Sequence, residues 1–153
     1  MVETTLSGAS HHILTNDYAS EWMGIEVLTL DDGHASIRMH LRQEMLNGFG
    51  MAHGGMIFAF GDTAFALACN PANPTPEQAA SITVASGVDI NFIKPAFQGQ
   101  VITAVADRRA TTGRSGLYDI QIYAASPDAD ASETGPGELI AEFRGRSRTI
   151  SKK

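Results

Sequence analysis

The segment 56–70 constrains the fold of this chain more than any other part of its sequence. Its residues are almost all apolar and rich in alanine, and at 3.6 residues per turn it is about four helical turns long. The prolines of residues 71–80 then end it in a loop. A helix that is apolar on every face must be buried, and a single such helix is buried only where a sheet curls around it. The sequence therefore predicts an α+β fold with one buried central helix.

Six segments with strand character flank this helix in the sequence. Apolar and polar residues alternate along 34–40 and 115–125, as they do in a strand with one buried face. The predicted strands cover residues 25–30, 34–40, 82–93, 100–112, 115–125 and 138–149. An Asp-Asp-Gly turn at 31–33 joins the first two strands, and the polar residues 126–137 form a long hairpin tip before the last.

A short helix is predicted before the first strand, over residues 16–24. Thr15 or Asn16 is its N-cap, and Gly24 ends it. Residues 1–11 are predicted to be a loose tail. The 153 residues suit a single domain, 1–153, with a full-sized core.

Composition excludes several kinds of site and partner. One cysteine excludes an intrachain disulfide and a Cys-based zinc site, and the histidines show no metal-ligand spacing, so we expect no metal. A formal net charge of −6 argues against nucleic acid and anionic membranes as partners. The sequence contains neither an apolar run of membrane-spanning length nor the pattern of a secretory leader, so we expect a cytoplasmic protein.

The charge is distributed unevenly along the chain. Residues 1–90 contain ten acidic and two basic residues, whereas residues 91–153 contain seven acidic and nine basic ones. We therefore expect the C-terminal part to bind any anionic ligand. Arg144, Arg146 and Arg148 alternate along one predicted strand and share a face, where they suit phosphate groups together with Lys94 and Arg114. A solvated sheet face explains any single one of these residues equally well.

Asp62 is the one carboxylate within the apolar helix. Removing an unpaired carboxylate from water costs several kcal/mol, so such a residue is usually paired, at a helix end or functional. Asp62 lies about two turns into the helix, and no Lys or Arg occurs within four residues of it. Two interpretations stay open, which are a functional carboxylate and a residue on a thin solvent stripe with Thr63 and Asn70.

A glycine pair, Gly54 and Gly55, follows His53 directly before the predicted helix. The unsatisfied N–H groups of a first helical turn stabilise a developing negative charge, as an oxyanion hole requires. Taken alone, however, the pair is better explained by a plain glycine turn into the helix, with His53 as an ordinary polar loop residue. Gly54 and Asp62 are eight residues apart, which is about 12 Å along a helix. A reacting carbonyl must lie about 3 Å from both its oxyanion donor and its base. If both residues act, two chains must share each site, so the function requires a dimer.

Residues 46–70 carry the clearest resemblance to a known family. They read Leu-Asn-Gly-Phe-Gly-Met-Ala-His-Gly-Gly-Met-Ile-Phe-Ala-Phe-Gly-Asp-Thr-Ala-Phe-Ala, with Ala-Cys-Asn at 68–70. This segment resembles the hotdog-fold acyl-CoA thioesterases of the phenylacetic-acid-degradation (PaaI) type. Shorter matches occur at residues 85–86, 90–95, 116–120 and 143–147. The resemblance implies a hotdog fold, in which a long buried helix is wrapped by an antiparallel β-sheet, and a homodimer that assembles further into a homotetramer.

The resemblance also implies roles for individual residues. Asp62 is the catalytic carboxylate, acting as nucleophile or as base for a water, on a carbonyl that the partner chain's Gly54 N–H, beside His53, polarises. Asn47 and Asn16 match positions that orient the thioester or line the acyl pocket. The predicted catalytic residues are Asp62, Gly54, His53 and Asn47, and the predicted substrate-binding residues are Asn16, Gly55, Ser86, Lys94, Arg114, Arg144 and Arg146.

The expected function is hydrolysis of an aryl-acetyl-CoA, of the phenylacetyl- or hydroxyphenylacetyl-CoA type, to the free acid and CoA. The only coenzyme in this reaction is the CoA of the substrate. A hotdog hydratase or dehydratase is one alternative, but it needs an acid–base pair, and no second acid or histidine stands out. A non-catalytic acyl-CoA-binding hotdog protein is the other. Cys69 is expected to pack as a small apolar residue rather than to act as a nucleophile.

Overall fold

The computed structural model describes residues 10–127 and 135–152. A short helix, α1 (Tyr18–Met23), precedes two strands, β1 (Glu26–Asp31) and β2 (His34–His40). The long helix α2 (Gly54–Cys69) follows, and then come β3 (Ser81–Phe92), β4 (Val101–Thr112), β5 (Ser115–Ala125) and β6 (Glu138–Ser151). Short 3-10 turns lie at His12–Leu14, Gln43–Met45 and Gln78–Ala80. All six predicted strands are present, each within two residues of its expected bounds.

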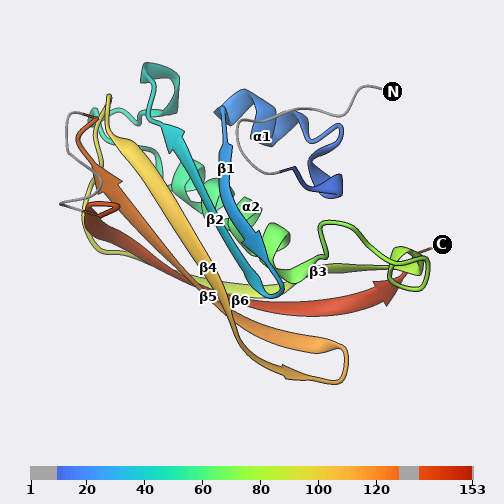
Figure 1. The fold of residues 1–153 in the computed structure, drawn as a ribbon. Helices are drawn as coiled ribbons and strands as arrows, with labels where there is room; N and C mark the ends of the chain where they lie inside the picture. Colours follow the sequence, from blue (N-terminus) through green and yellow to red (C-terminus); the bar gives the residue numbers. More distant parts are fainter. Residues whose placement is uncertain (1–9, 128–134, 153) are drawn as a thin grey trace.

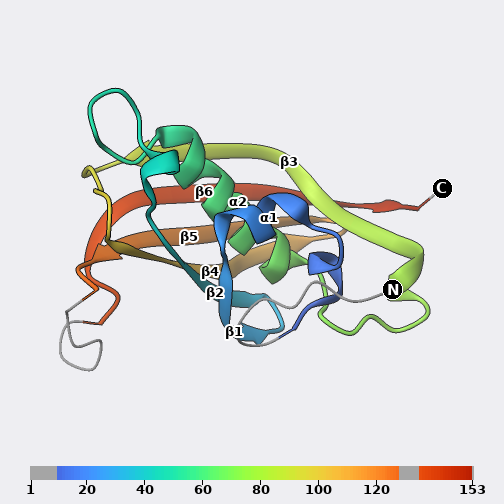
Figure 2. The same ribbon diagram turned by 90° about the horizontal axis from the view of Figure 1, so that it is seen from above.

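The strands form one antiparallel sheet in the order β1-β2-β4-β5-β6-β3. The sheet is strongly curved, and α2 lies along its concave side (Figure 1). Seen from above, α1 lies over α2, so α2 is placed between α1 and the sheet (Figure 2). This arrangement confirms the expected α+β hotdog architecture of a long helix wrapped by an antiparallel sheet. No helix in the described part of the chain is long and apolar enough to span a membrane.

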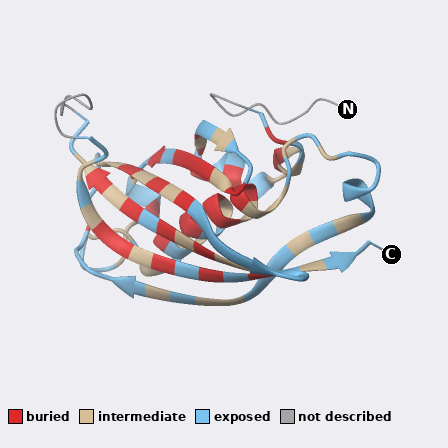
Figure 3. Ribbon diagram, turned by 60° about the horizontal axis from the view of Figure 1, so that its bottom comes forward, coloured by how far each residue is buried: buried red, intermediate tan, exposed pale blue. Residues whose placement is uncertain are grey.

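The core lies between α2 and the concave face of the sheet. Buried residues alternate with exposed ones along the central strands, which gives the banded pattern of Figure 3. The buried residues of β2, β4, β5 and β6 include Ala35, Ile37, Met39, Ile102, Ala104, Ala106, Ile120, Ile122, Ala141 and Phe143. They pack against the buried side of α2, formed by Ile57, Phe60, Gly61, Ala64, Phe65, Leu67 and Ala68. The edge strand β3 has no fully buried residue.

Two reciprocal glycine–phenylalanine contacts bring α2 close to β6. A Cβ on Gly61 of α2 would lie 2.9 Å from a ring carbon of Phe143 of β6, and a Cβ on Gly145 of β6 would lie 2.6 Å from a ring carbon of Phe65 of α2. The centroids of the Phe65 and Phe143 rings are 6.0 Å apart. Glycine in a helix costs about 1 kcal/mol relative to alanine, and at Gly61 this cost is explained by the approach of the ring.

The helix α2 begins at Gly54, two residues before the predicted start at Met56. His53 is its N-cap, because the His53 Nδ1 accepts a hydrogen bond of 3.0 Å from the Gly55 N–H. Gly54 and Gly55 are therefore part of the first helical turn and do not precede the helix as a separate glycine turn.

The N-cap of α1 also differs from the prediction of Thr15 or Asn16. Asp17 caps this helix, with its Oδ1 accepting a hydrogen bond from the Ser20 N–H at 3.0 Å. Asn16 has a left-handed backbone with φ of 62°, so the chain turns at Asn16 and reaches the cap conformation one residue later. Gly24 ends α1 with φ of 70°, as predicted.

Asn70 ties the C-terminal end of α2 to β3 and to the N-terminal segment. Its side chain accepts a hydrogen bond from the Thr83 N–H (3.1 Å) and donates to the carbonyl oxygens of Thr83 and Ala66 (both 3.0 Å). The main-chain carbonyl of Asn70 accepts a hydrogen bond from His11 Nε2 at 2.8 Å. Burial lowers the pKa of His11, which is only 1 % exposed. The prediction of a loose tail over 1–11 is therefore wrong at His11, while residues 1–9 lie outside the described residues.

The predicted hairpin tip at 126–137 falls between β5 and β6, as expected from the strand bounds. Its middle, residues 128–134, also lies outside the described residues.

Candidate active site

One face of α2 is not covered by any other part of the described chain, residues 10–127 and 135–152. Gly55, Phe58 and Asp62, spaced three and four residues apart, lie along this face, and Phe58 is 38 % exposed. The sheet covers one side of α2 and α1 covers only part of the other, so the buried helix keeps a narrow solvent-facing stripe, as one of the two interpretations of Asp62 anticipated. Asp62 lies on this open stripe, one helical turn after the exposed ring of Phe58.

The Asp62 carboxylate has no cationic partner. Within residues 10–127 and 135–152, no Lys, Arg or His side chain forms an ion pair or hydrogen bond with it. Although the side chain reaches solvent in the single chain, desolvation by the surrounding protein raises the pKa of Asp62, and the negative charge of Asp17 raises it further. An unpaired carboxylate with a raised pKa is suited to accept a proton or to attack a carbonyl.

The first turn of α2 leaves one N–H group without an acceptor. The Gly55 N–H donates to His53 Nδ1, and the N–H groups of Met56 and Ile57 donate to the His53 carbonyl oxygen at 2.9 and 3.2 Å. In the described part of the chain, no atom accepts a hydrogen bond from the Gly54 N–H. The capping by His53 thus leaves the Gly54 N–H, at the positive end of the helix dipole, to bind an anionic oxygen.

Asn47 shapes the loop that leads into this turn. Its Oδ1 accepts hydrogen bonds from the N–H groups of Phe49 (2.9 Å) and Met51 (3.2 Å), and its own N–H donates to the Met51 carbonyl at 2.7 Å. The His53 N–H in turn donates to the Met45 carbonyl at 2.8 Å. Asn47 therefore fixes the backbone that positions His53 and Gly54.

An apolar pocket of about 310 Å³ borders Gly54. It lies between the first turn of α2 and the end of β3, and its lining includes Met51, Ile57, Phe92 and Lys94. The ring of Phe92 lies against the helix end, because a Cβ on Gly54 would be in ordinary van der Waals contact with it at 3.4 Å. Of the predicted site residues, Gly54 and Lys94 thus share one pocket.

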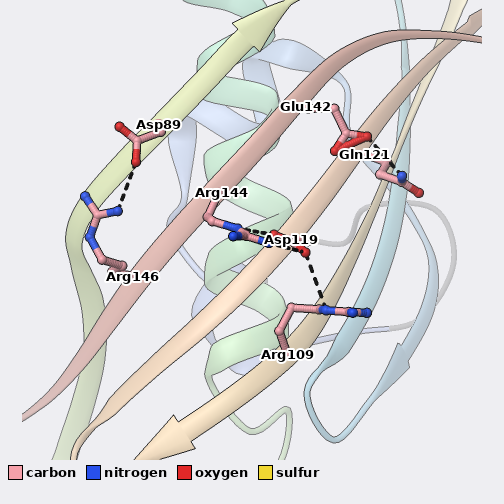
Figure 4. Close-up of polar contacts among 7 residues, drawn as sticks. All are labelled: Asp89, Arg109, Asp119, Gln121, Glu142, Arg144 and Arg146. Carbon is pink, nitrogen blue, oxygen red and sulfur yellow. Dashed lines mark hydrogen bonds and ion pairs between the residues drawn. The ribbon is translucent and has the colours of Figure 1, made fainter.

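Two of the arginines predicted to meet phosphates, Arg144 and Arg146, lie on the face of the sheet opposite α2 and are engaged in ion pairs (Figure 4). Arg144 donates two hydrogen bonds to Asp119, at 2.6 and 2.9 Å, and Arg146 pairs with Asp89 at 3.0 Å. Arg109 adds a second, longer contact to Asp119 at 3.4 Å. The hydrogen bond from Arg144 is the main cause that lowers the pKa of Asp119. In this chain the two arginines neutralise neighbouring carboxylates and are not free cations.

The remaining predicted contacts are separate from Asp62. Ser86 and Arg146 line a hollow of about 280 Å³ near the β4–β5 turn, where the Ser86 hydroxyl donates to the Arg146 carbonyl at 3.1 Å. Arg114 lies in that turn, and its main-chain carbonyl accepts a hydrogen bond from the Thr149 N–H. Asn16 directly precedes the N-cap of α1. Within one chain the structure therefore does not gather the predicted residues into one site.

Two further observations concern nucleophiles and metals. Cys69 is partly buried and its pKa is raised to about 12, mainly by desolvation, which agrees with the expected packing role. Across the described ranges, no group of three or more His, Cys, Asp or Glu side chains is placed to hold a metal ion. The charged residue that sequence reasoning missed is Asp17, whose effect on Asp62 depends on how α1 packs against α2.

Comparison with known proteins places these features in context. Residues 49–130 match the thioesterase superfamily. The chain is 34 % identical over 141 residues to the acyl-coenzyme A thioesterase PaaI of Escherichia coli (strain K12), a match that covers 92 % of this chain and 89 % of that protein. The solved structure of the E. coli PaaI protein from the phenylacetic acid degradation operon has a TM-score of 0.76 at 33 % identity and covers 92 % of this chain and 90 % of that one. A mutant of the phenylacetic acid degradation protein PaaI from Thermus thermophilus has a TM-score of 0.71 at 28 % identity, with coverages of 86 % and 98 %.

Proposed function

The chain belongs to the thioesterase superfamily and is a thioester hydrolase, and from this premise we propose that its substrate is an acyl-coenzyme A. The observation that carries the proposal is the pairing of two groups on one helix. Asp62 is an unpaired carboxylate with a raised pKa, and the Gly54 N–H is a donor without an acceptor in the described part of the chain. Thioester hydrolysis needs both a base or nucleophile and a donor for the oxyanion.

In the proposed mechanism the Gly54 N–H binds the thioester carbonyl oxygen and stabilises the negative charge that develops on it. Asp62 either accepts a proton from the attacking water or attacks the carbonyl carbon itself. In the first route the water oxygen bonds to the carbonyl carbon, the C–S bond breaks, and the leaving thiolate takes up the proton that Asp62 accepted. In the second route, breakage of the C–S bond leaves an anhydride on Asp62, which a water molecule hydrolyses while the thiolate takes up a proton. Both routes give the carboxylic acid and the thiol of CoA. The reaction consumes only the thioester and water, so it requires no cofactor beyond the CoA of the substrate.

Each active site is proposed to form between two chains. Gly54 is the first residue of α2 and Asp62 lies in the middle of the same helix, about 12 Å away along its axis. One substrate carbonyl therefore cannot contact both residues of the same chain. The open stripe of α2 and the edge strand β3 offer a surface for a second copy, because both carry exposed apolar side chains. These are Phe58 on α2 and Ile82, Val84 and Phe92 on β3. We propose an isologous dimer across this surface, which places the Gly54 of one chain near the Asp62 of its partner, and a tetramer of two such dimers.

The proposed acyl group is aryl-acetyl, of the phenylacetyl or hydroxyphenylacetyl type. The apolar pocket beside Gly54 supports it, because Met51, Ile57 and Phe92 provide a flexible and aromatic lining next to the carbonyl donor. The names of the relatives from phenylacetic acid degradation point in the same direction. Asn16, Gly55, Ser86, Lys94, Arg114, Arg144 and Arg146 remain proposed substrate contacts, as does a cytoplasmic location for the protein.

A thiol-release assay tests this function. The purified protein is incubated with phenylacetyl-, hydroxyphenylacetyl-, short-chain and long-chain acyl-CoA, and free thiol is measured with a chromogenic disulfide. We expect release from the aryl-acetyl esters, and a loss of about 10²-fold or more in Asp62→Asn, the range for removing a general base. Asp107→Asn, which makes the same change at an ion pair with His34 on the outer face of β4, should retain turnover. Loss of enoyl absorbance without thiol release would instead indicate a hydratase, and binding without any turnover a non-catalytic protein.

Mixed dimers test whether two chains share each site. Gly54→Pro removes the N–H at the first helical position, where proline is well tolerated. Asp62→Asn and Gly54→Pro are each expected to be inactive alone. Refolded together in equal amounts, they should recover about a quarter of wild-type activity, because half of the dimers are mixed and each contains one intact site. No recovery would contradict a site built from two chains.

A further inference from the structure

A chain of side-chain hydrogen bonds joins α1 to α2 and ends one residue from Asp62. The Asp17 carboxylate accepts hydrogen bonds from the Ser20 N–H (3.0 Å, Oδ1) and from the Ser20 hydroxyl (2.8 Å, Oδ2). The Ser20 hydroxyl is also 3.0 Å from the hydroxyl of Thr63 on α2. Because Ser20 gives its single hydroxyl proton to Asp17, Thr63 must be the donor in the second bond. The direction of both bonds is thus fixed by the carboxylate.

The middle of this chain of hydrogen bonds is buried, and the chain fixes where the Asp17 charge lies. Ser20 is 1 % exposed, so its hydroxyl is shielded from water, whereas Asp17 and Thr63 are half-buried. Thr63 is the residue after Asp62 on α2, which ties the position of the Asp17 carboxylate to that of Asp62. Helix capping alone does not explain the charge, because Asn and Ser cap helices about as well as Asp.

The negative charge of Asp17 acts together with burial on the pKa of Asp62. After desolvation, the negative charge of Asp17 is the remaining cause of the raised pKa of Asp62. On α2 itself, the nearest titratable group is the Cys69 thiol, which is neutral because its pKa is raised to about 12. Glu21 is exposed on α1 and does not contribute to the shift. Several charged residues of the strands that pack against α2 are engaged with one another. The pairs are Glu26 with Arg38, His34 with Asp107, Asp89 with Arg146 and Asp119 with Arg144.

On the basis of the proposed function, we propose that Asp17, clamped by Ser20 and Thr63, is a positioning residue whose fixed negative charge makes Asp62 a stronger proton acceptor. Asp17 acts through Asp62 and does not contact the substrate. A carboxylate whose pKa is closer to neutral pH abstracts a proton from water more effectively. The site is therefore a pair of carboxylates with different tasks, one reacting and one held in place by α1.

The test compares Asp17→Asn with wild type in a pH profile of kcat/KM for thiol release. Asn keeps the cap and removes the charge, so the acid limb of the profile should move to lower pH while the rate on the plateau falls. Asp17→Ser, a second uncharged cap, should behave in the same way and covers the case in which Asp17→Asn folds poorly. A purely structural role for Asp17 would lower the rate at all pH values without moving the limb.

Glu21→Gln is the matched control, because it removes one negative charge from the same short helix outside the hydrogen-bonded chain. Its acid limb should coincide with that of wild type. The inference is overturned if the limb of Asp17→Asn also coincides with wild type, or if Glu21→Gln moves it equally.

A second readout separates this inference from the proposed function. The Asp62 carboxyl is titrated by ¹³C NMR in wild type and in Asp17→Asn, without substrate. If wild type releases no thiol from any acyl-CoA, the proposed function fails, and the titration then decides on Asp17 alone. A lower midpoint in Asp17→Asn sustains the coupling between the two carboxylates, and an unchanged midpoint refutes it.

Discussion

Replacing Gly145 with alanine tests the close contact between β6 and α2. The new Cβ would lie 2.6 Å from one ring carbon of Phe65 and less than 3 Å from two more. Phe65 is 1 % exposed, and its ring is confined by Tyr118 and Phe143, at centroid distances of 5.5 and 6.0 Å. The ring therefore cannot turn into solvent. Gly145 does not have a positive φ, so the effect of alanine comes from crowding and not from backbone strain.

The size of the effect follows from two opposing contributions to the free energy of unfolding. Crowding a well-packed core costs about 1–3 kcal/mol. Replacing glycine by alanine at a compatible backbone recovers about 0.4–1 kcal/mol by restricting the unfolded chain. Because three ring carbons must move, crowding is the larger contribution. We expect a net loss of about 1–2 kcal/mol and a decrease in Tm of roughly 2–8 °C.

Urea unfolding at one fixed protein concentration measures this loss, because association would otherwise change the apparent stability. Gly145→Ala should have a lower midpoint with an unchanged m value. Gly48→Ala is the control, since a Cβ there meets no atom within 4 Å. Phe65→Leu should relieve the crowding, so the double variant should lose less than the sum of the two single losses. A Gly145→Ala protein as stable as wild type, or strictly additive losses, would refute the contact as described.

Three further predictions concern the thiol, the outer face and the edge strand. Cys69, with a pKa raised to about 12, should react with a thiol reagent at pH 8 at least about 10-fold more slowly in the native protein than in urea; equal rates would contradict its burial. The pKa of Asp119 is lower in the folded protein than in the unfolded chain, because Asp119 pairs with Arg144. This pairing therefore stabilises the fold fully at pH values above the pKa of Asp119 in the unfolded chain, and the stabilisation is lost as the pH falls through the pKa of Asp119 in the folded protein. The midpoint difference between wild type and Arg144→Ala in urea should therefore shrink on acidification; a constant difference would exclude this linkage. Val84→Lys on β3 should shift the proposed dimer towards monomer in sedimentation, whereas Leu28→Lys on the opposite edge strand should not.

Much of the fold is predictable because one-sided burial imposes a period of two on the strands. The strand bounds follow from that period alone, but the position of β3 beside β6, far from β2, depends on contacts between distant segments. The first residues of the helices are less predictable, because they depend on which residue forms the N-cap. His53 is not among the preferred N-cap residues, so the sequence indicates a later start for α2. Asn16 and Asp17 are both good caps, and the left-handed backbone of Asn16 decides between them.

The candidate site is predictable where the chemical character of a residue differs from that of its neighbours in the sequence. A carboxylate in an apolar helix singles out Asp62, and the paired glycines single out Gly54. The influence of Asp17 on Asp62 has no such signal, because it arises only when α1 packs on α2. Arg144 is a second residue whose partner cannot be predicted from the sequence. Its alternation correctly places it on an outward face, but its partner Asp119 is on the neighbouring strand and cannot be read from β6.

Asn70 has a consequence for how far the sheet can grow. The amide of Asn70 occupies both the N–H and the carbonyl of Thr83 on the edge strand β3. Any strand added to this edge finds those two groups already taken, as they would be by a neighbouring strand. An incoming strand can therefore pair with the rest of β3 but not with Thr83, so one amide side chain limits where a further strand can be added to this edge of the sheet.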